Sequence, residues 1–267
     1  MSGMERICVI GNSHLGAAKH GWESIRAQNP GQQLTFFGAP WDMLSDLALE
    51  DGDLVALTEK LQHKLRRASG GLDRICTGDY DRFILYGLQF GPRRVLMTYR
   101  NFRPQSFEWR DGLEDLNPLR RERGPMQAVS ERLFDRIALA GLRSTLAVRI
   151  ADMIAEVSNA PVQLVAAPGF SERVLDTGDW DGPLGSGDVD RLAMRVRRLL
   201  RKACPEGVQL ILPRRHLIRH GLFTARSYAA EDRPGGQPDD VHTAPAYAGE
   251  MLGAAISAGR EANRSAA

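Results

Sequence analysis

The stretch ICVIGNSHL, residues 7–15, joins a short apolar run to a small polar segment. Residues 7–11 are continuously apolar, as expected of a strand covered on both faces. The Gly-Asn-Ser-His that follows delivers Ser13 to the start of a helix, where backbone amides stabilise negative charge. Taken alone, this position favours Ser13 as a helix cap over Ser13 as a nucleophile. The segment has neither GxGxxG nor GKS/GKT, so it is not a common phosphate loop.

Four further apolar runs recur along the chain and alternate with helical patterns. They cover residues 33–38, 82–87, 162–168 and 208–213. Two intervening segments, 146–157 and 192–203, carry apolar residues at i, i+4, i+7, i+8 and i+11, which is typical of one apolar helix face. The alternation predicts an α/β fold with a mainly parallel, five-stranded sheet. The arginines on the opposite face of the second helix are interpreted as a solvated surface: Arg191, Arg195, Arg197, Arg198 and Arg201.

The chain has an ordinary globular composition, with 43% apolar and 25% charged residues in 267, and we expect one domain over 1–267. Two long connections interrupt the alternation, an insertion at about 97–141 and a second connection at 214–241. The formal net charge of +2 gives no global field for nucleic acid. No apolar run is long enough for a signal peptide or a membrane span, so we expect a cytoplasmic protein without membrane association.

The three cysteines and one pair of histidines are the candidates for a metal or redox site. Cys8, Cys76 and Cys204 lie far apart without CxxC spacing, which favours small buried residues and a reducing compartment. His216 and His220 have the i, i+4 spacing of two ligands on one helix face. No third ligand is evident and basic residues crowd the segment, so a solvated basic stretch is favoured and no metal is expected.

The segment DDVHTAPAYA, residues 239–248, changes the interpretation of Ser13, because Asp239 precedes His242 by three residues. An imidazole activates a serine when an acceptor holds its Nδ1–H and leaves Nε2 free to take the hydroxyl proton. A carboxylate three residues upstream, on a turn entering a helix, can supply that acceptor. Separately, Asp239 is compatible with a loop or capping role and His242 with a surface role. Together with Ser13 they favour acyl-transfer chemistry.

The blocks GNSH after the first strand and D-x-x-H near the C-terminus resemble the SGNH (GDSL-like) hydrolase superfamily. This resemblance implies a flavodoxin-like, three-layer α/β/α fold and a serine hydrolase acting on ester bonds. It implies Ser13 as nucleophile, His242 as general base and Asp239 as the partner that orients His242. The Ser13 amide, the Gly38 amide and Gln89 would form the oxyanion hole, and no cofactor or metal would be required.

Two blocks depart from the family pattern. The family has Gly-x-Asn after the third strand, whereas this chain has Gly87-Leu88-Gln89. Glutamine keeps an amide donor but adds a methylene, so Gln89 either serves as a donor, is replaced by another donor, or is simply a polar residue at a strand end. Asn12 stands where many family members carry aspartate, which is a lesser departure.

The expected function is hydrolysis of an acetyl or other short-chain acyl ester through a Ser-His-Asp acyl-enzyme mechanism. The expected partner is a small-molecule or carbohydrate ester. Three alternatives stay open: acyl transfer with the same residues, a degenerate module that binds a glycan or protein without turnover, and a flavodoxin-like phosphate binder. The acyl group, the alcohol and the oligomeric state are not determined by the sequence.

Basic and aromatic side chains are interleaved in the 97–141 insertion. They are Arg100, Arg103, Arg110, Tyr99, Phe102, Phe107 and Trp109. Rings that stack on sugar faces, with guanidinium groups that pair with carboxylate or sulfate, would suit an acidic sugar. The candidate substrate-binding residues are therefore Arg100, Arg103 and His14, the last at the pocket rim. The simpler alternative is that the aromatic residues dock the insertion on the domain and the arginines face solvent.

Overall fold

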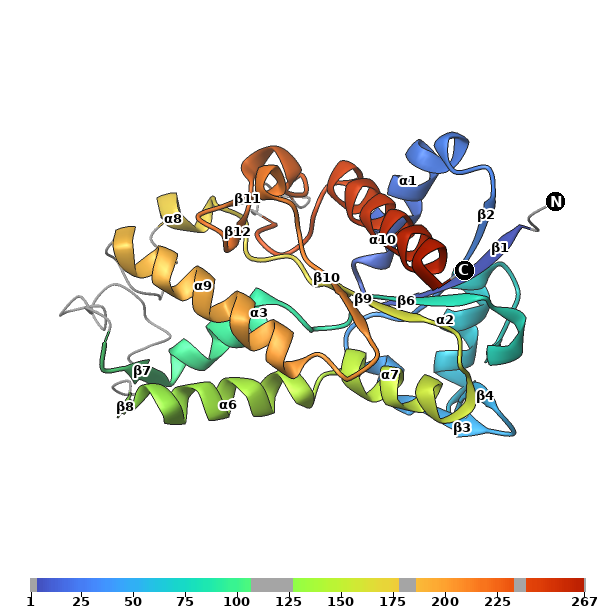
Figure 1. Cartoon of the computed structure of the whole chain (residues 1–267), viewed down its shortest axis with the longest axis horizontal. Coiled ribbons are helices and arrows are strands. Elements are labelled where there is room, and N and C mark those ends of the chain that lie inside the picture. Colours follow the sequence, from blue (N-terminus) through green and yellow to red (C-terminus); the bar gives the residue numbers. More distant parts are fainter. Residues whose placement is uncertain (1–3, 107–126, 178–185, 233–238, 267) are drawn as a thin grey trace.

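The computed structural model describes residues 4–106, 127–177, 186–232 and 239–266, and its centre is a five-stranded parallel sheet (Figure 1). The strands are β1 (Glu5–Gly11), β2 (Gln32–Gly38), β6 (Arg82–Gly87), β9 (Val162–Ala166) and β10 (Gln209–Ile211). Their order, β10-β9-β6-β1-β2, is that of flavodoxin-like sheets. The α/β class and the five predicted strands are confirmed.

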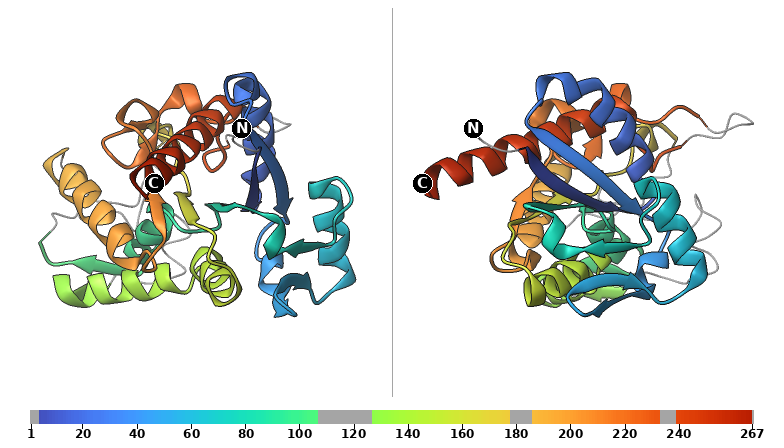
Figure 2. Two further views of the ribbon diagram at one scale, coloured as in Figure 1. Left: turned by 45° about the vertical axis from the view of Figure 1, so that its right-hand side comes forward. Right: turned by 90° about the vertical axis from the view of Figure 1, so that its right-hand side faces the viewer.

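Helices cover both faces of this sheet and make three layers (Figures 1 and 2). One face carries α1 (Leu15–Ile25) and α10 (Pro245–Ala266), and the other carries α2 (Glu59–Ser69), α3 (Pro92–Leu96), α6 (Glu131–Arg143), α7 (Leu146–Val157) and α9 (Ser186–Ala203). Ile7 and Val9 of β1 pack on the α1 and α10 side, whereas Cys8 and Ile10 pack on the opposite side. Successive strand residues point to opposite faces, so a continuous apolar run is needed where both faces are covered.

Helices α1 and α10 approach each other closely at two glycines. A Cβ atom at Gly21 would lie 2.4 Å from the backbone nitrogen of Gly249 and 2.6 Å from the carbonyl oxygen of Pro245. A side chain is therefore excluded at Gly21, where the two helices approach most closely. Because Ser13 lies just before α1 and His242 just before α10, the crossing sets the relative position of these two residues.

A buried arginine ties the sheet to α10. The Arg82 side chain is 2% exposed, and its Nε donates to Glu5 Oε1 over 2.9 Å. Its Nη1 donates to the carbonyl oxygens of Ala255 and Ile256, each at 3.4 Å. These bonds connect β1, β6 and the middle of α10, so they hold the helix that follows the D-x-x-H segment against the sheet.

A second, antiparallel sheet lies between β2 and β6 in the chain and was not predicted from the sequence. It consists of β3 (Leu47–Glu50), β4 (Asp53–Ala56) and β5 (Arg74–Cys76). Asp51 and Gly52 form the two-residue turn between β3 and β4, with φ of 52° and 87°. Two positive φ values in succession are what a tight hairpin of this kind requires.

The two long connections contain short regular elements. The insertion at 97–141 includes β7 (Phe102–Pro104), β8 (Gln127–Val129) and most of α6, which continues beyond residue 141. The connection at 214–241 includes β11 (Ile218–Arg219) and β12 (Phe223–Thr224). Short helices complete the described chain: η1 (Arg26–Gln28), η2 (Met43–Asp46), η3 (Thr77–Asp79), η4 (Met97–Arg100), α8 (Val174–Thr177), η5 (Arg215–Leu217) and η6 (Arg226–Tyr228).

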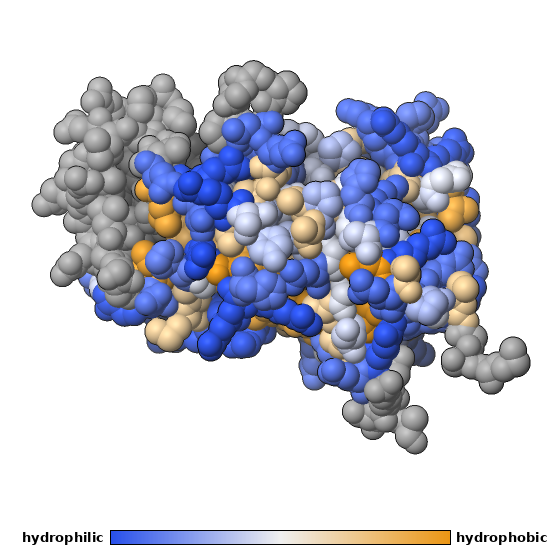
Figure 3. All heavy atoms as spheres, turned by 90° about the horizontal axis from the view of Figure 1, so that it is seen from above, coloured by the Kyte–Doolittle hydropathy of each residue, from blue (hydrophilic) through white to orange (hydrophobic). Residues whose placement is uncertain are grey.

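The described part of the chain has three free thiols and, on the face shown in Figure 3, a mostly hydrophilic surface. The described helices include none that is both long and apolar enough to cross a membrane. Cys8, Cys76 and Cys204 are free thiols, the first buried and the other two half-buried. Seen from above, the coloured surface is mostly hydrophilic, with apolar side chains scattered in small groups (Figure 3). That face therefore carries no extended apolar patch among the residues described.

Candidate functional site

Ser13 lies in the turn between β1 and α1, at the carboxyl edge of the sheet. The helix begins at Leu15, and no side chain caps its N-terminus. The turn is closed instead by Asn12, whose Oδ1 accepts a hydrogen bond from the His14 backbone at 3.3 Å. The Ser13 hydroxyl is exposed and lies 3.2 Å from Nε2 of His242. The capping interpretation of Ser13 is therefore wrong, because its hydroxyl bonds a residue 229 positions away instead of the helix.

Asp239 holds the other nitrogen of the His242 ring. Its Oδ1 and Oδ2 lie 3.0 and 2.9 Å from His242 Nδ1. The same Oδ1 accepts from the backbone N–H groups of Val241 and His242 at 3.2 and 3.1 Å, which fixes the carboxylate on its own turn. Since the carboxylate can only accept here, the neutral ring carries its proton on Nδ1 and presents Nε2 as an acceptor to Ser13.

Asp240 takes a different role from its neighbour. Its backbone oxygen accepts from the Ser171 N–H at 2.9 Å, and its carboxylate lies 4.0 Å from Nε of Arg173. Asp239 is therefore the carboxylate that faces the imidazole, as the D-x-x-H spacing predicts. The chain Asp239–His242–Ser13 runs from a residue only 8% exposed to an exposed hydroxyl. Such an arrangement can move a proton from the serine to the imidazole.

His14 is buried next to His242 and is not at an exposed rim. Only 5% of the residue is exposed, and its ring centroid is 5.2 Å from that of His242. Burial, with further contributions from His242 and Arg93, lowers the pKa of His14 to about 3, while Asp239 opposes the shift. His14 is consequently neutral at pH 7. Its surroundings favour a packing and electrostatic role beneath the serine over direct contact with a ligand.

Gly38 ends β2 directly opposite Gly11 of β1. A Cβ atom at Gly38 would lie 2.5 Å from the Gly11 carbonyl oxygen and 2.5 Å from Cδ2 of Leu15. Close packing of the two strands against α1 therefore requires glycine here, independently of any catalytic role. The position beside the Ser13 turn is compatible with an amide donor to an oxyanion, and that role stays a prediction.

The Gly87-Leu88-Gln89 segment has an unusual backbone. Its three residues have φ of 77°, 44° and 66°, a left-handed run that costs non-glycine residues about 1–3 kcal/mol each. The Leu88 side chain is fully buried, which offsets part of the cost, whereas Gln89 is exposed. A Cβ at Gly87 would lie 3.4 Å from Cδ2 of His14, so this loop borders the Ser13 turn. The Gln89 side chain has no hydrogen bond to the described residues, and its role as a donor stays a prediction.

Among the described residues, the candidate binding residues of the insertion make no contact with Ser13. Arg103 is exposed on β7. The side chain of Arg100, and all of Phe107, Trp109 and Arg110, fall outside the described residues. Tyr99 is 1% exposed and its ring centroid lies 4.3 Å from that of Phe134. Both residues belong to the insertion, so this contact holds the insertion together internally, and the buried Tyr99 ring is not available as a sugar platform.

The histidine pair of the second connection does not share a helix face. His216 lies in the short η5 helix and bonds Glu250, whereas His220 lies in the turn between β11 and β12 with φ of 48°. Within the described ranges, no group of three or more His, Cys, Asp or Glu residues could hold a metal ion. The helical spacing suggested by the sequence is wrong because the chain changes from a 3₁₀ turn to a strand within this segment.

Two features at the strand ends were missed by the sequence analysis. Trp41 follows β2, is 82% exposed and has φ of 57°, an uncommon conformation for a bulky residue. The guanidinium of Arg93, in α3, packs over the Phe170 ring at 4.9 Å and is close enough to His14 to lower its pKa. Their place just after the carboxyl ends of strands could have identified them, since ligands of open α/β sheets bind at that edge.

Comparison with known proteins adds nothing to this geometry: no family model and no curated protein matches the sequence. The interpretation of the site therefore depends on the arrangement of Ser13, His242 and Asp239. A hydroxyl, an imidazole and a carboxylate bonded in that order are the parts needed for nucleophilic attack with general-base assistance.

Proposed function

We propose that this chain is an SGNH-type serine hydrolase that cleaves a short-chain acyl ester, with an acylated sugar hydroxyl as the candidate substrate. The single observation that carries the proposal is the 3.2 Å approach of His242 Nε2 to Ser13 Oγ, with Nδ1 held by Asp239. A serine and a histidine so far apart in sequence meet with the correct ring nitrogen facing the hydroxyl. The three free cysteines favour a reducing compartment such as the cytoplasm.

The chemistry follows from the bonding order. Ser13 Oγ attacks the acyl carbonyl carbon while its proton passes to His242 Nε2, and Asp239 stabilises the resulting imidazolium. Collapse of the tetrahedral intermediate breaks the bond to the alcohol oxygen, which takes the proton from Nε2. Water then attacks the acyl-enzyme by the same route, giving the carboxylic acid and restoring Ser13.

The developing oxyanion needs donors, and the best placed are backbone amides at the strand ends. We assign the amides of Ser13 and Gly38 to this role, with Gln89 as a third donor. One well-placed donor is worth about 10²–10³ in rate. Gln89 lies in a loop with a strained left-handed conformation, which is the kind of backbone commonly held at functional sites.

The test is labelling with a fluorophosphonate followed by peptide mass spectrometry. The proposal expects stoichiometric modification at Ser13 that is lost on denaturation. Ser130 provides a matched control, because it also precedes a helix but its Oγ caps α6 by accepting from the Leu133 N–H at 3.2 Å. Ser130→Ala should keep the labelling and Ser13→Ala should abolish it. Labelling that persists in folded Ser13→Ala protein would refute the nucleophile assignment.

Turnover of acetyl esters then separates an enzyme from an inert binding module. Ser13→Ala and His242→Ala should each lower ester turnover by on the order of 10³-fold or more while the protein still unfolds cooperatively. Acetate release measured with and without an added sugar acceptor distinguishes hydrolysis from transfer. Labelling of Ser13 without turnover of any acyl ester would favour the binding module over the enzyme.

A further inference from the structure

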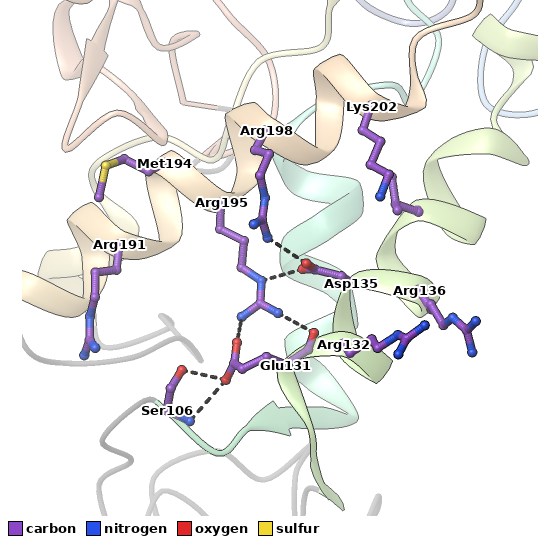
Figure 4. Close-up of a pocket in the computed structure, with 11 residues that line it drawn as sticks. Ser106, Glu131, Arg132, Asp135, Arg136, Arg191, Met194, Arg195, Arg198 and Lys202 are labelled. Atoms are coloured by element: carbon purple, nitrogen blue, oxygen red, sulfur yellow. Dashed lines mark hydrogen bonds and ion pairs between the residues drawn. The ribbon is translucent and has the colours of Figure 1, made fainter.

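A second, strongly basic hollow lies away from Ser13, between α6 and α9 (Figure 4). Its volume is about 840 Å³. We call it the α6–α9 groove and define it by its six cationic side chains: Arg132 and Arg136 on α6, and Arg191, Arg195, Arg198 and Lys202 on α9. The arginine face of α9 is therefore not simply solvated, as the sequence suggested, because part of it faces another helix.

Arg195 is the structural member of this groove. It is 8% exposed, and Figure 4 shows it reaching from α9 to Glu131 and Asp135 of α6. Its Nε donates to Asp135 Oδ1 at 2.7 Å, and its Nη2 donates to the Glu131 carbonyl oxygen at 2.7 Å. A second Nη pairs with the Glu131 carboxylate, and the guanidinium lies 4.8 Å over the Phe134 ring. Arg195 therefore joins the two helices.

The two carboxylates of the groove are already engaged. Glu131 pairs with Arg195 and also accepts from the backbone N–H of Ser106 at 3.1 Å. Asp135 pairs with Arg195 and, through Oδ2, with Arg198 at 2.6 Å. Among the described lining residues, six cationic side chains thus face two carboxylates, which is an excess of positive charge in a chain that is nearly neutral as a whole.

Three cations of the groove take no part in holding the helices together. Arg132, Arg136 and Lys202 are exposed, and none of them forms an ion pair with a carboxylate in the described ranges. Arg132 and Arg136 are one helical turn apart on α6, and Lys202 lies near the C-terminal end of α9, where it lines the same groove (Figure 4). These side chains are available to an anionic ligand without disturbing the fold.

The spacing of the charges indicates the kind of anion. On α9, residues 191, 195, 198 and 202 form one stripe that spans about 16 Å along the helix. Charges spread along a line suit a chain with repeated negative groups better than one phosphate, which needs donors converging on a point. Aromatic rings are absent from the described lining, so there is no stacking platform of the kind that single-stranded nucleic acid uses.

We propose that the α6–α9 groove binds an acidic polysaccharide, with Arg132, Arg136 and Lys202 contacting its carboxylate or sulfate groups. Helices α6 and α9 extend past the carboxyl ends of β6 and β9, the end of the sheet at which Ser13 lies (Figure 1). The inference does not depend on the chemistry of Ser13. Where both hold, the groove would anchor a polymer whose acyl groups are removed at the serine.

The probe is a heparin-derived hexasaccharide, titrated into the full-length protein by calorimetry, with a neutral hexasaccharide and a single-stranded hexanucleotide as comparators. Binding of the sulfated probe alone, with an affinity that falls as NaCl is raised, is the expected result. The variant Arg132→Gln/Arg136→Gln/Lys202→Gln should weaken that binding by about tenfold or more. Its fluorophosphonate labelling rate should equal that of the wild type, since Ser13 lies outside the groove.

The matched control removes three charges elsewhere: Arg67→Gln/Arg197→Gln/Arg201→Gln. Arg67 is on α2, and Arg197 and Arg201 are on α9 outside the groove lining. This variant should bind the sulfated hexasaccharide like the wild type. Equal weakening in both triple variants would mean unspecific charge attraction and would overturn the proposal. Tighter binding of the hexanucleotide, or no binding of the sulfated probe at low salt, would overturn it as well.

Discussion

Burial of His14 should make the stability of this protein fall as the solution is acidified. The perturbation is His14→Gln, which removes the titrating imidazole from beneath Ser13 while keeping a polar side chain. In the folded protein the pKa of His14 is lowered from 6.5 to about 3, first by burial and then by the neighbouring His242 and Arg93. The unfolded chain therefore takes up a proton at His14 more readily than the folded chain does.

The sign and size follow from proton linkage. His14 contributes fully to stability above pH 6.5, and that contribution is lost progressively as the pH falls from 6.5 towards 3. Each pH unit within this window costs about 1.4 kcal/mol, so the loss between pH 7.5 and pH 5.0 is about 2 kcal/mol. Carboxylates titrate in the same range in the wild type and in His14→Gln. Subtracting the free energy of unfolding of one from that of the other therefore isolates the contribution of His14.

Urea unfolding at pH 7.5, 6.5, 5.5 and 5.0 measures this difference. The wild type should lose about 2 kcal/mol more of its unfolding free energy than His14→Gln across the series. His63 is exposed on α2, and His63→Gln serves as a control that removes a surface histidine and should follow the wild-type curve. Parallel curves for wild type and His14→Gln would refute the reasoning, because a histidine buried in its neutral form cannot leave the pH dependence unchanged.

Three further outcomes are expected. Asp239→Asn should lower p-nitrophenyl acetate turnover by up to about 10⁴-fold, because an amide no longer enforces the His242 tautomer that presents Nε2 to Ser13. Wild-type turnover in this variant would exclude the orienting role of Asp239. Gly21→Ala should lower the free energy of unfolding in urea by about 1–3 kcal/mol, since the new Cβ would lie 2.4 Å from a backbone nitrogen of α10. Gly16→Ala is the control on the same helix: its Cβ would meet nothing within 4 Å, and stability should be unchanged. Arg82→Met should lower the free energy of unfolding by about 3 kcal/mol, because it removes the buried partner of Glu5 and leaves that carboxylate unpaired. Adding Glu5→Gln to this variant should recover part of the loss.

Local patterns in the sequence were sufficient for the sheet and for part of the site. A strand covered on both faces must be apolar throughout, so each of the five short apolar runs predicted a central strand, and each is one. The amphipathic stripe over 146–157 coincides with α7. The contact between Asp239 and His242 spans three residues on one turn, which is why spacing alone predicted it.

Features that depend on contacts between segments far apart in the chain could not be predicted from local patterns. The hairpin turn at Asp51-Gly52 is a local signal that was overlooked, but the burial of Arg195 follows only from the carboxylates that α6 brings to α9. The serine in GNSH has the sequence of a helix cap. Only the tertiary structure shows that its hydroxyl turns instead towards His242.

The sequence by itself determined the elements and the residue types of the candidate site, because periodicity and turn chemistry act over a few residues. Tertiary structure decided the distance between Ser13 and His242, since that distance is set where α1 crosses α10 at Gly21 and Gly249. It also decided which charged residues became structural and which stayed exposed. Both outcomes depend on contacts between segments far apart in the chain, and neither segment's own sequence specifies which partner it will meet.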